Sequence, residues 1–294
     1  MPARRGRAFL CDGILCDGFI WKYLFEDLAN EANVTHWNYS GHGRSAAPND
    51  PAGVGIQQCA RDLTTIRSAI RGEAAEGEAA KGESSARTDV LFGHSMGCQV
   101  ALEGWRTDPA RVGGIVLLCG TFGNVTSTFR GVPVLDMVLP KLLKAAEAWP
   151  DLLRAIWTRV PSETVLKMAL KLGEVDPEHV RPEDFLPYLQ HMTRVDPKLF
   201  LTMLRSAGDH SAGGYLGQID VPVLIVAGER DTFTPSFLSD AMAKAIPNAE
   251  LVVVPKATHC APIEQPLWVW EKVRTFLRTK VWTERTSESS APSP

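Results

Sequence analysis

One serine lies between two glycines where an apolar run gives way to residues that suit a helix, in VLFGHSMGCQVAL, residues 90–102. A serine hydroxyl is a poor nucleophile unless a base takes its proton and a tight strand-to-helix turn holds its oxygen exposed. Gly93 and Gly97 remove side chains that would clash near Ser95, and the following helix points its first N–H groups at charge developing there. The pentapeptide alone also occurs by chance in turns. Its strand and helix context indicates a nucleophile for acyl chemistry.

The elements that must position this serine alternate along the chain. Short apolar runs rich in Val, Leu and Ile are typical of strands buried on both faces of a parallel sheet. The predicted strands are 7–11, 34–38, 90–93, 112–119, 221–227 and 250–254. The predicted helices are 21–29, 56–71, 97–107, 235–246 and 266–279. This alternation predicts an α/β domain wound by right-handed crossovers.

Two segments interrupt the alternation, and a third ends it. Residues 72–87, GEAAEGEAAKGESSAR, are low in complexity and predict a solvated loop or frayed helical extension. Residues 124–215 show helical apolar spacing punctuated by prolines and predict a helical insertion. The core is therefore expected at 1–123 and 216–282, with a disordered polar tail at 283–294.

Composition and charge indicate which kinds of molecule the protein is expected to bind. The chain has 294 residues and a formal net charge of -3, which gives no reason to expect nucleic acid or an anionic membrane. No apolar run is long enough to span a bilayer, and acidic residues break the N-terminal apolar stretch that a signal peptide would need. The six cysteines lack zinc-type clustering, which favours buried free thiols in a cytoplasmic protein. A small-molecule partner is expected, with no cofactor and no metal.

From about Phe9 to about Thr279, the sequence resembles the α/β-hydrolase superfamily. That family orders its triad as Ser, acid, His, with the acid after a late strand and the histidine after the last one. Here VPVLIVAGERDTFTP places Asp231 after a predicted strand, and ELVVVPKATHCAPIEQP places His259 after the last. Each could instead be a capping carboxylate or a loop histidine, and Glu229 is the nearest rival acid. The resemblance implies that Ser95 attacks, His259 transfers the proton and Asp231 orients the imidazole.

The same resemblance implies an oxyanion hole made by the backbone N–H groups of Met96 and Ile14. In the loop CDGILCDGF, Asp12 replaces the usual histidine. An ionised carboxylate aimed at the oxyanion would oppose catalysis, so its side chain is expected to turn away and to accept two backbone N–H groups. The turn GHGRS also resembles a family turn, and His42 there is interpreted as structural.

Comparison of the sequence with the family pattern leads to one expectation about the sheet and one about the substrate. The chain lacks the family's N-terminal hairpin, which predicts a reduced sheet of about six strands, all parallel. The insertion, 124–215, occupies the position of the family's cap and is expected to have a core separate from that of the sheet. Its Leu, Met and Trp stripes favour an uncharged, largely apolar acyl substrate, and His179, His191 or His210 could face the pocket.

Three functions remain open. A serine nucleophile in an ordinary turn favours a carboxylic ester hydrolase acting through an acyl-enzyme. The same triad also serves thioester, lactone, carbon-carbon bond or perhydrolytic chemistry. A non-catalytic ligand-binding protein that keeps the fold is the third. The natural substrate and the oligomeric state are left open by the sequence.

Overall fold

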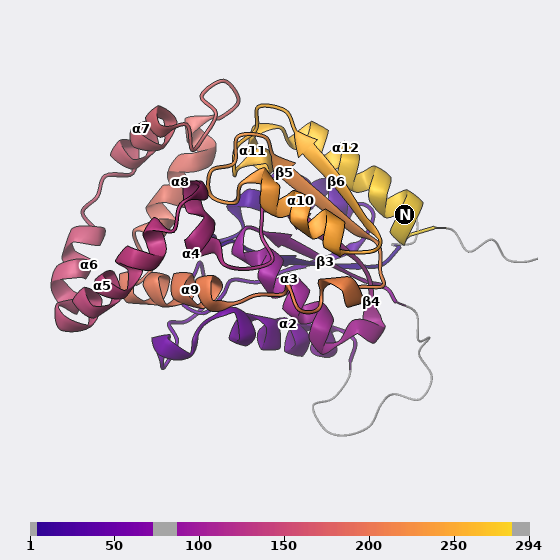
Figure 1. Ribbon diagram of the computed structural model, residues 1–294, viewed down its shortest axis with the longest axis horizontal. Coiled ribbons are helices and arrows are strands. Elements are labelled where there is room, and N and C mark those ends of the chain that lie inside the picture. Colours follow the sequence, from indigo (N-terminus) through magenta and orange to yellow (C-terminus); the bar gives the residue numbers. More distant parts are fainter. Residues whose placement is uncertain (1–4, 73–86, 284–294) are drawn as a thin grey trace, which may run out of the picture.

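The computed structural model describes residues 5–72 and 87–283, and within them one parallel sheet of six strands forms the centre of the molecule (Figure 1). The strands are β1 (Arg7–Cys11), β2 (Asn33–His36), β3 (Asp89–His94), β4 (Val112–Leu118), β5 (Val223–Gly228) and β6 (Ala249–Val254). Their order is β2-β1-β3-β4-β5-β6, and each neighbouring pair is parallel. The predicted reduced, all-parallel sheet is confirmed.

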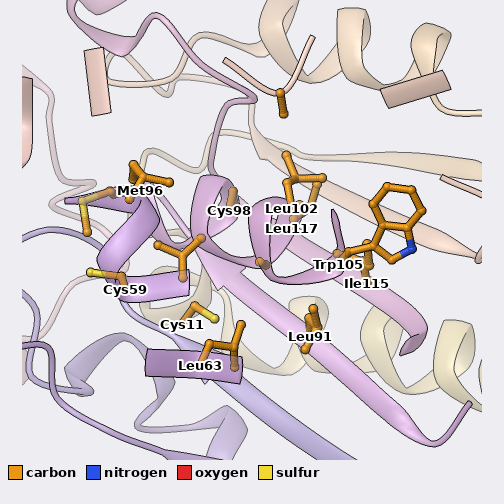
Figure 2. Packing of buried hydrophobic residues seen from close by; sticks show 14 of the residues in the cluster. Cys11, Cys59, Leu63, Leu91, Met96, Cys98, Leu102, Trp105, Ile115 and Leu117 are labelled. Carbon is orange, nitrogen blue, oxygen red and sulfur yellow. The ribbon is translucent and has the colours of Figure 1, made fainter. Parts of the chain in front are cut away.

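Helices cover both faces of this sheet because its side chains alternate between two apolar clusters. On β3, for example, Leu91 packs on one face, whereas Val90 and Phe92 pack on the other. Figure 2 shows part of the first cluster, where Leu63 of α2 lies near Leu91. The helices at the predicted positions are α1 (Leu24–Ala29), α2 (Ile56–Ile70), α3 (Met96–Thr107), α10 (Ser236–Ala245) and α12 (Pro266–Phe276). A further short helix, α11 (Ala261–Glu264), lies where the sequence predicts none.

Short turns of other helical types complete the connections. The 3-10 turns are η1 (Phe19–Trp21), η2 (Pro51–Gly53), η3 (Pro109–Arg111), η4 (Phe129–Gly131) and η5 (Leu216–Gln218), and a π-helical turn, η6 (Leu277–Val281), follows α12.

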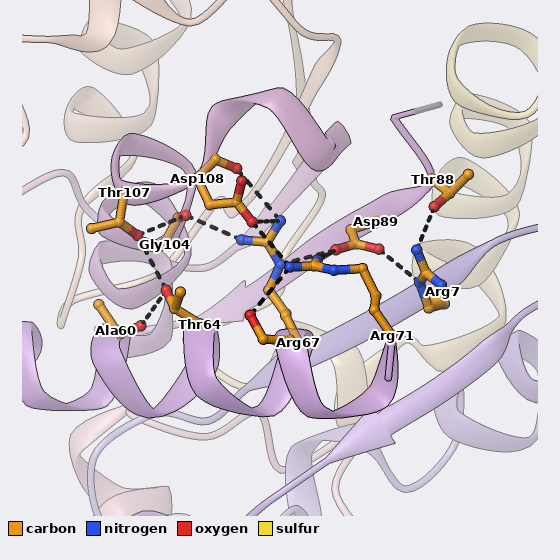
Figure 3. A network of polar contacts seen from close by, with 11 residues as sticks. Arg7, Ala60, Thr64, Arg67, Arg71, Thr88, Asp89, Gly104, Thr107 and Asp108 are labelled. Atoms are coloured by element: carbon orange, nitrogen blue, oxygen red, sulfur yellow. Dashed lines mark hydrogen bonds and ion pairs between the residues drawn. The ribbon is translucent and has the colours of Figure 1, made fainter. Parts of the chain in front are cut away.

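A buried ion cluster holds the amino end of β3, opposite the end that carries Ser95. The carboxylate of Asp89 accepts from Arg7, Arg67 and Arg71 at 2.8 to 3.0 Å (Figure 3). Because both Asp89 and Arg67 are fully buried, removing one partner would leave an uncompensated charge in the core. The cluster thus fixes β3 and α2 relative to each other.

Six helices between β4 and β5 make up the helical insertion. They are α4 (Val125–Thr128), α5 (Val134–Ala148), α6 (Pro150–Trp157), α7 (Ser162–Leu172), α8 (Pro182–Met192) and α9 (Pro197–Asp209). In Figure 1, α5 to α8 lie to the left of the sheet, beyond the carboxyl ends of its strands, and α9 runs back toward α2 and α3.

The expected separate core of this insertion is wrong. Leu199 and Met203 of α9 belong to the cluster that covers one face of the sheet, and Leu166 of α7 and Phe185 of α8 belong to the cluster on the other. A small cluster around Leu139 is made by insertion residues alone. The helical spacing of the insertion predicts its helices correctly, but that spacing carries no information about which surface each stripe packs against.

Several sequence predictions concern the chain outside the core. Residues 73–86 and 284–294, most of the predicted solvated segment and tail, lie outside the described residues. Among the described helices, none is long and apolar enough to cross a membrane. All six cysteines are free, five of them buried, and burial raises the pKa of each thiol. They therefore stay protonated and pack as small apolar side chains.

Candidate active site

Ser95 occupies a strained turn between β3 and α3. Its backbone has φ 55° and ψ −122°, a conformation that side-chain-bearing residues rarely adopt. A Cβ on Gly97 would lie 2.0 Å from the carbonyl oxygen of Cys11, and one on Gly93 would lie 2.4 Å from that of Gly97. Gly97 therefore allows α3 to start directly against the end of β1, and Gly93 allows the first turn of α3 to pack against β3. The turn holds the serine at the carboxyl edge of the sheet.

Asp231 and His259 follow β5 and β6, and the structure brings them into contact. His259 Nδ1 lies 2.9 Å from Asp231 Oδ2, so the Nδ1 proton is donated to the carboxylate and Nε2 is left as the basic nitrogen. The buried carboxylate also accepts from the backbone N–H groups of Phe233 and Thr234 and from the Thr234 hydroxyl, at 2.8 to 2.9 Å. These donors fix the carboxylate against the imidazole.

Glu229, the rival acid, lies elsewhere. Its carboxylate accepts from the backbone N–H of Lys256 at 2.6 Å. It therefore ties two loops together at an exposed position, and Asp231 is the acid placed against His259.

Two residues that the sequence did not single out hold the loop of His259. His94 Nε2 donates to the His259 carbonyl oxygen at 3.0 Å, and the two rings lie 5.0 Å apart. Because His94 directly precedes Ser95 in the chain, this contact ties the loop of His259 to the turn that carries the serine. Glu264 is buried and accepts from the N–H and hydroxyl of Thr258, each at 2.7 Å.

The electrostatic setting of His94 keeps its ring neutral. Burial, together with the neighbouring His259, lowers the pKa of His94 to about 3. A neutral ring can donate from Nε2 without placing a positive charge beside His259. His94 is thus suited to positioning and not to acid catalysis at neutral pH.

The loop after β1 supplies the other side of the site. A Cβ on Gly13 would lie 3.1 Å from both His94 Nδ1 and Ser95 Cβ, so this backbone passes directly over the serine. Ile14 and Met96 line the same cavity as Ser95. As the first residue of α3, Met96 also has an N–H with no partner inside the helix.

Asp12 turns away from this cavity, but not in the expected way. Its carboxylate accepts from the Trp21 indole N–H at 2.7 Å and lies 2.8 Å from His36 Nε2. The expectation of two backbone N–H partners is therefore wrong. A ring N–H from η1 and one from the end of β2 satisfy the buried carboxylate instead, because both chain segments converge on the loop.

A cavity of about 240 Å³ opens beside Ser95. Its wall is largely apolar and combines core residues with residues of α4, α5 and α9. The lining residues are Ile14, Ser95, Met96, Gln99, Thr121, Val125, Phe129, Leu135, Phe200, Leu204, Ala207, Phe233 and Thr234. Phe233 also contacts the ring of His259, with centroids 5.1 Å apart. The wall of the cavity thus extends from Ser95 to Phe233, which contacts His259.

The other histidines named from the sequence do not line this cavity. His42 donates from Nδ1 to the Ser40 carbonyl oxygen in its turn. His179 pairs with Asp176 at 2.8 Å, and His191 Nε2 accepts from the N–H of Gly43. His210 lies behind the wall, where its Nδ1 is 3.2 Å from Gln99 Nε2.

Among the described residues, Asp176, Glu178 and His179 could offer ligand atoms to a metal ion, all within 4.8 Å of one another. The Asp176 carboxylate already accepts from the Glu178 N–H and from the His179 ring. These contacts explain the cluster without an ion, and it lies away from the cavity lining.

Comparisons with known proteins identify relatives of this chain. The sequence profile described as the Alpha/beta hydrolase family matches residues 13–272. A Bacillus subtilis (strain 168) protein provisionally named 2-succinyl-6-hydroxy-2,4-cyclohexadiene-1-carboxylate synthase is 23% identical over 263 residues, 87% of this chain and 85% of that protein. The 2-hydroxy-6-oxononadienedioate/2-hydroxy-6-oxononatrienedioate hydrolase of Cupriavidus pinatubonensis is 25% identical over 191 residues, 65% of this chain and 60% of that protein.

A solved structure shows the fold. A thermophilic esterase from Thermogutta terrifontis superposes with a TM-score of 0.72 at 21% identity, covering 94% of this chain and 90% of the esterase.

Proposed function

This chain belongs to the alpha/beta hydrolase family, and from that premise we propose that it is a serine hydrolase cleaving a carboxylic ester of a largely apolar small molecule. The observation that carries the proposal is the convergence of three loops at one cavity. Ser95, Met96 and Ile14 line it, and so does Phe233, whose ring contacts that of His259, the partner of Asp231.

In the proposed mechanism, His259 acts first as a base and then as an acid in each half-reaction. His259 Nε2 takes the Ser95 proton as the serine oxygen bonds to the acyl carbon, and the carbonyl electrons move onto the oxygen. The N–H groups of Met96 and Ile14 stabilise this oxyanion. The C–O bond to the leaving alcohol then breaks, and the imidazolium returns its proton to that alcohol. Water repeats the sequence, releasing the acid and restoring Ser95.

Asp231 contributes through position and charge. Its fixed carboxylate keeps the Nδ1 proton in place and stabilises the imidazolium that forms during each step. His94 and Glu264 act as positioning residues, since they hold the His259 loop by its backbone and its neighbour.

The wall of the cavity favours an uncharged acyl group. No Lys, Arg, Asp or Glu occurs among the described residues that line it. Helices of the insertion supply part of that wall, so residues 124–215 are proposed to act as a cap that shapes the acyl pocket. Thioester, lactone, carbon-carbon bond and perhydrolytic chemistry remain alternatives on the same triad.

The first test is labelling and turnover of the Ser95→Ala variant. A fluorophosphonate should label the wild-type chain, and Ser95→Ala should lose both labelling and p-nitrophenyl ester turnover while its Tm changes little. Retention of more than a few per cent of turnover would remove Ser95 from the mechanism. Absence of labelling in the wild type would favour a non-catalytic binding protein.

The second test compares the two acids. Asp231→Asn should lower kcat by about three to four orders of magnitude by disturbing the histidine tautomer. The matched control is Glu229→Gln, which touches the Lys256 backbone and should leave kcat within about threefold. The reverse ranking would show that the acid is misassigned. A parallel screen of 1,3-diketones distinguishes ester from carbon-carbon bond cleavage.

A further inference from the structure

One residue that lines the cavity carries a buried polar atom with no hydrogen-bond partner among the described residues. Apart from Ser95, three lining residues carry polar side chains: Gln99, Thr121 and Thr234. The Thr121 hydroxyl donates to the Gly123 carbonyl oxygen and accepts from the Gly123 N–H. The Thr234 hydroxyl donates to Asp231. Gln99 Oε1, in contrast, is buried, and no residue that the structure describes forms a hydrogen bond with it.

The orientation of the Gln99 amide is fixed by its other half. Nε2 donates to the Ala207 carbonyl oxygen at 2.8 Å and lies 3.2 Å from His210 Nδ1. The flipped amide would set two acceptors against each other at Ala207, so the assignment of oxygen and nitrogen is determined by the network. Both amide hydrogens are therefore occupied on the side of α9.

His210 accepts this contact as a neutral ring. Burial lowers its pKa, and its Nε2 faces the Glu103 carboxylate at 3.5 Å. Glu103 in turn accepts from the Tyr215 hydroxyl at 2.9 Å. The chain of contacts holds Gln99 rigidly, and it leaves the carbonyl oxygen as the single unused hydrogen-bonding position of the side chain.

An orphaned buried acceptor is unfavourable unless something pairs with it in the working protein. Gln99 is fully buried and lies one helical turn after Ser95 on α3, so the two residues are separated by about 6 Å along the helix axis. An acyl group bonded to Ser95 and extending along the cavity wall would pass this position.

Resting on the proposed function, we propose that Gln99 Oε1 accepts a hydrogen bond from the acyl part of the substrate, and that the preferred substrates are esters whose acyl chain carries a hydroxyl group a few carbons from the carbonyl. The rest of the chain lies in the apolar wall formed by side chains such as Phe200 and Leu204. Because the oxygen is buried, the entering acyl chain displaces apolar lining side chains to reach it.

The experiment compares three p-nitrophenyl esters of each chain length: the plain acyl ester, its hydroxy derivative with the hydroxyl on C3 to C6, and the methyl ether of that derivative. The wild type should favour the hydroxy ester in kcat/KM by about tenfold over the methyl ether at one position or more. The ether carries the oxygen without the donor, so it separates hydrogen bonding from polarity. Equal values for all three esters at every position would overturn the proposal.

Variants then assign the preference to one atom. Gln99→Met keeps the length of the side chain and removes the acceptor, and it should reduce the hydroxy-to-ether ratio by about tenfold. Thr121→Val is the matched control, since its hydroxyl is already paired, and it should leave the ratio unchanged. If Gln99→Met lowers turnover of all three esters equally, Gln99 merely supports α9 and the proposal fails.

A binding measurement separates this proposal from the proposed function. The corresponding methyl ketones carry the same acyl chains without a leaving group, and their binding to the Ser95→Ala variant is measured by thermal shift. Tighter binding of the hydroxy ketone than of its ether supports the Gln99 contact even if no ester is turned over. Ester turnover with no preference in either assay supports the hydrolase and contradicts the contact.

Discussion

Asp12 shows how a buried carboxylate can lie next to an oxyanion site without opposing it. Its negative charge is directed toward Trp21 and His36, and its own carbonyl oxygen accepts from the Tyr39 hydroxyl at 3.0 Å. Two elements, η1 and β2, and the segment that follows β2 are therefore tied to the residue that precedes Gly13 and Ile14. The position of the proposed oxyanion donor depends on this residue through the backbone.

Replacing Asp12 should consequently affect folding and catalysis together. Asp12→Ala leaves the buried Trp21 indole N–H unsatisfied, which costs about 1 to 3 kcal/mol, and removes the acceptor of the partly exposed His36 ring. We expect a lower Tm, a lower free energy of unfolding in urea and a lower kcat. Asp12→Asn should be milder, because its oxygen still accepts from Trp21 and its NH2 can donate to His36 in the other tautomer.

One result would contradict the supporting role of Asp12. If Asp12→Asn changed the acidic limb of the pH profile of kcat/KM and left the Tm untouched, Asp12 would be a direct catalytic partner instead of a support for the loop.

At the scale of single residues, the sequence predicted those residues whose signals are local. Ser95, Asp231 and His259 each follow an apolar run that was recognised as a strand. Gln99 and His94 were missed because their partners, Ala207 and the His259 backbone, lie 108 and 165 residues away. A glutamine within an otherwise apolar helical stretch was the available signal for a buried polar contact.

Among the elements, the junction of β1 and α3 sets the geometry of the site. The strands were predicted within a few residues, and the four inner ones, β1, β3, β4 and β5, are largely buried and read as continuous apolar runs. What sequence periodicity does not encode is how close two backbones come. At Gly97 the backbone of α3 lies directly against the carbonyl oxygens of Cys11 and Asp12.

Gly97→Ala should therefore be strongly destabilising. Its Cβ would lie 2.0 Å from the Cys11 oxygen and 2.7 Å from the Asp12 oxygen, and both are backbone atoms that cannot rotate aside. We expect a loss of several kcal/mol in the free energy of unfolding, measured in urea, with loss of activity in any folded fraction.

Gly214→Ala is the matched control for this substitution. A Cβ at Gly214 would meet no atom within 4 Å, and its backbone is not in the left-handed region. Its free energy of unfolding should stay within about 0.5 kcal/mol of the wild type. Equal effects of the two substitutions would show that the contact at β1 is not what requires a glycine.

On the scale of the whole molecule, the helical insertion and the sheet share their apolar interior. The apolar clusters on both faces of the sheet continue into α7, α8 and α9. Polar contacts also join the insertion to the rest of the molecule. Gln99 donates to the Ala207 carbonyl oxygen in α9, and Glu264 accepts from the Asp176 N–H at 2.9 Å. Sequence patterns located the insertion, but shared packing of this kind depends on contacts between residues far apart in the chain.

This shared interior contains neutral histidines, and they make global stability sensitive to acid. Burial lowers the pKa of His42, His94, His191 and His210 in the folded chain. An unfolded histidine titrates near 6.5, so below that pH the unfolded chain binds more protons than the folded one. Stability is therefore complete above about pH 6.5 and falls as the pH decreases. Glu103, Asp176 and Asp220, whose pKa values are lowered from 4.5 or 3.8, add to the loss only at more acidic pH.

His94 provides the cleanest test of this linkage, because its pKa of about 3 keeps the folded ring neutral through the whole window from pH 6.5 to pH 4.5. Once the unfolded ring is fully charged, His94 contributes one proton to the pH dependence of the free energy of unfolding, or about 1.4 kcal/mol per pH unit.

His94→Gln keeps a side-chain donor for the His259 carbonyl oxygen but cannot titrate. Urea unfolding at pH 8 measures the change in the hydrogen bond alone, and the same experiment at pH 5 adds the titration. We expect the variant to lose less stability than the wild type between these two pH values, by about 2 kcal/mol. Parallel pH profiles for the two proteins would mean that the folded ring accepts a proton as readily as the unfolded one, and His94 would then carry positive charge beside His259 in acid.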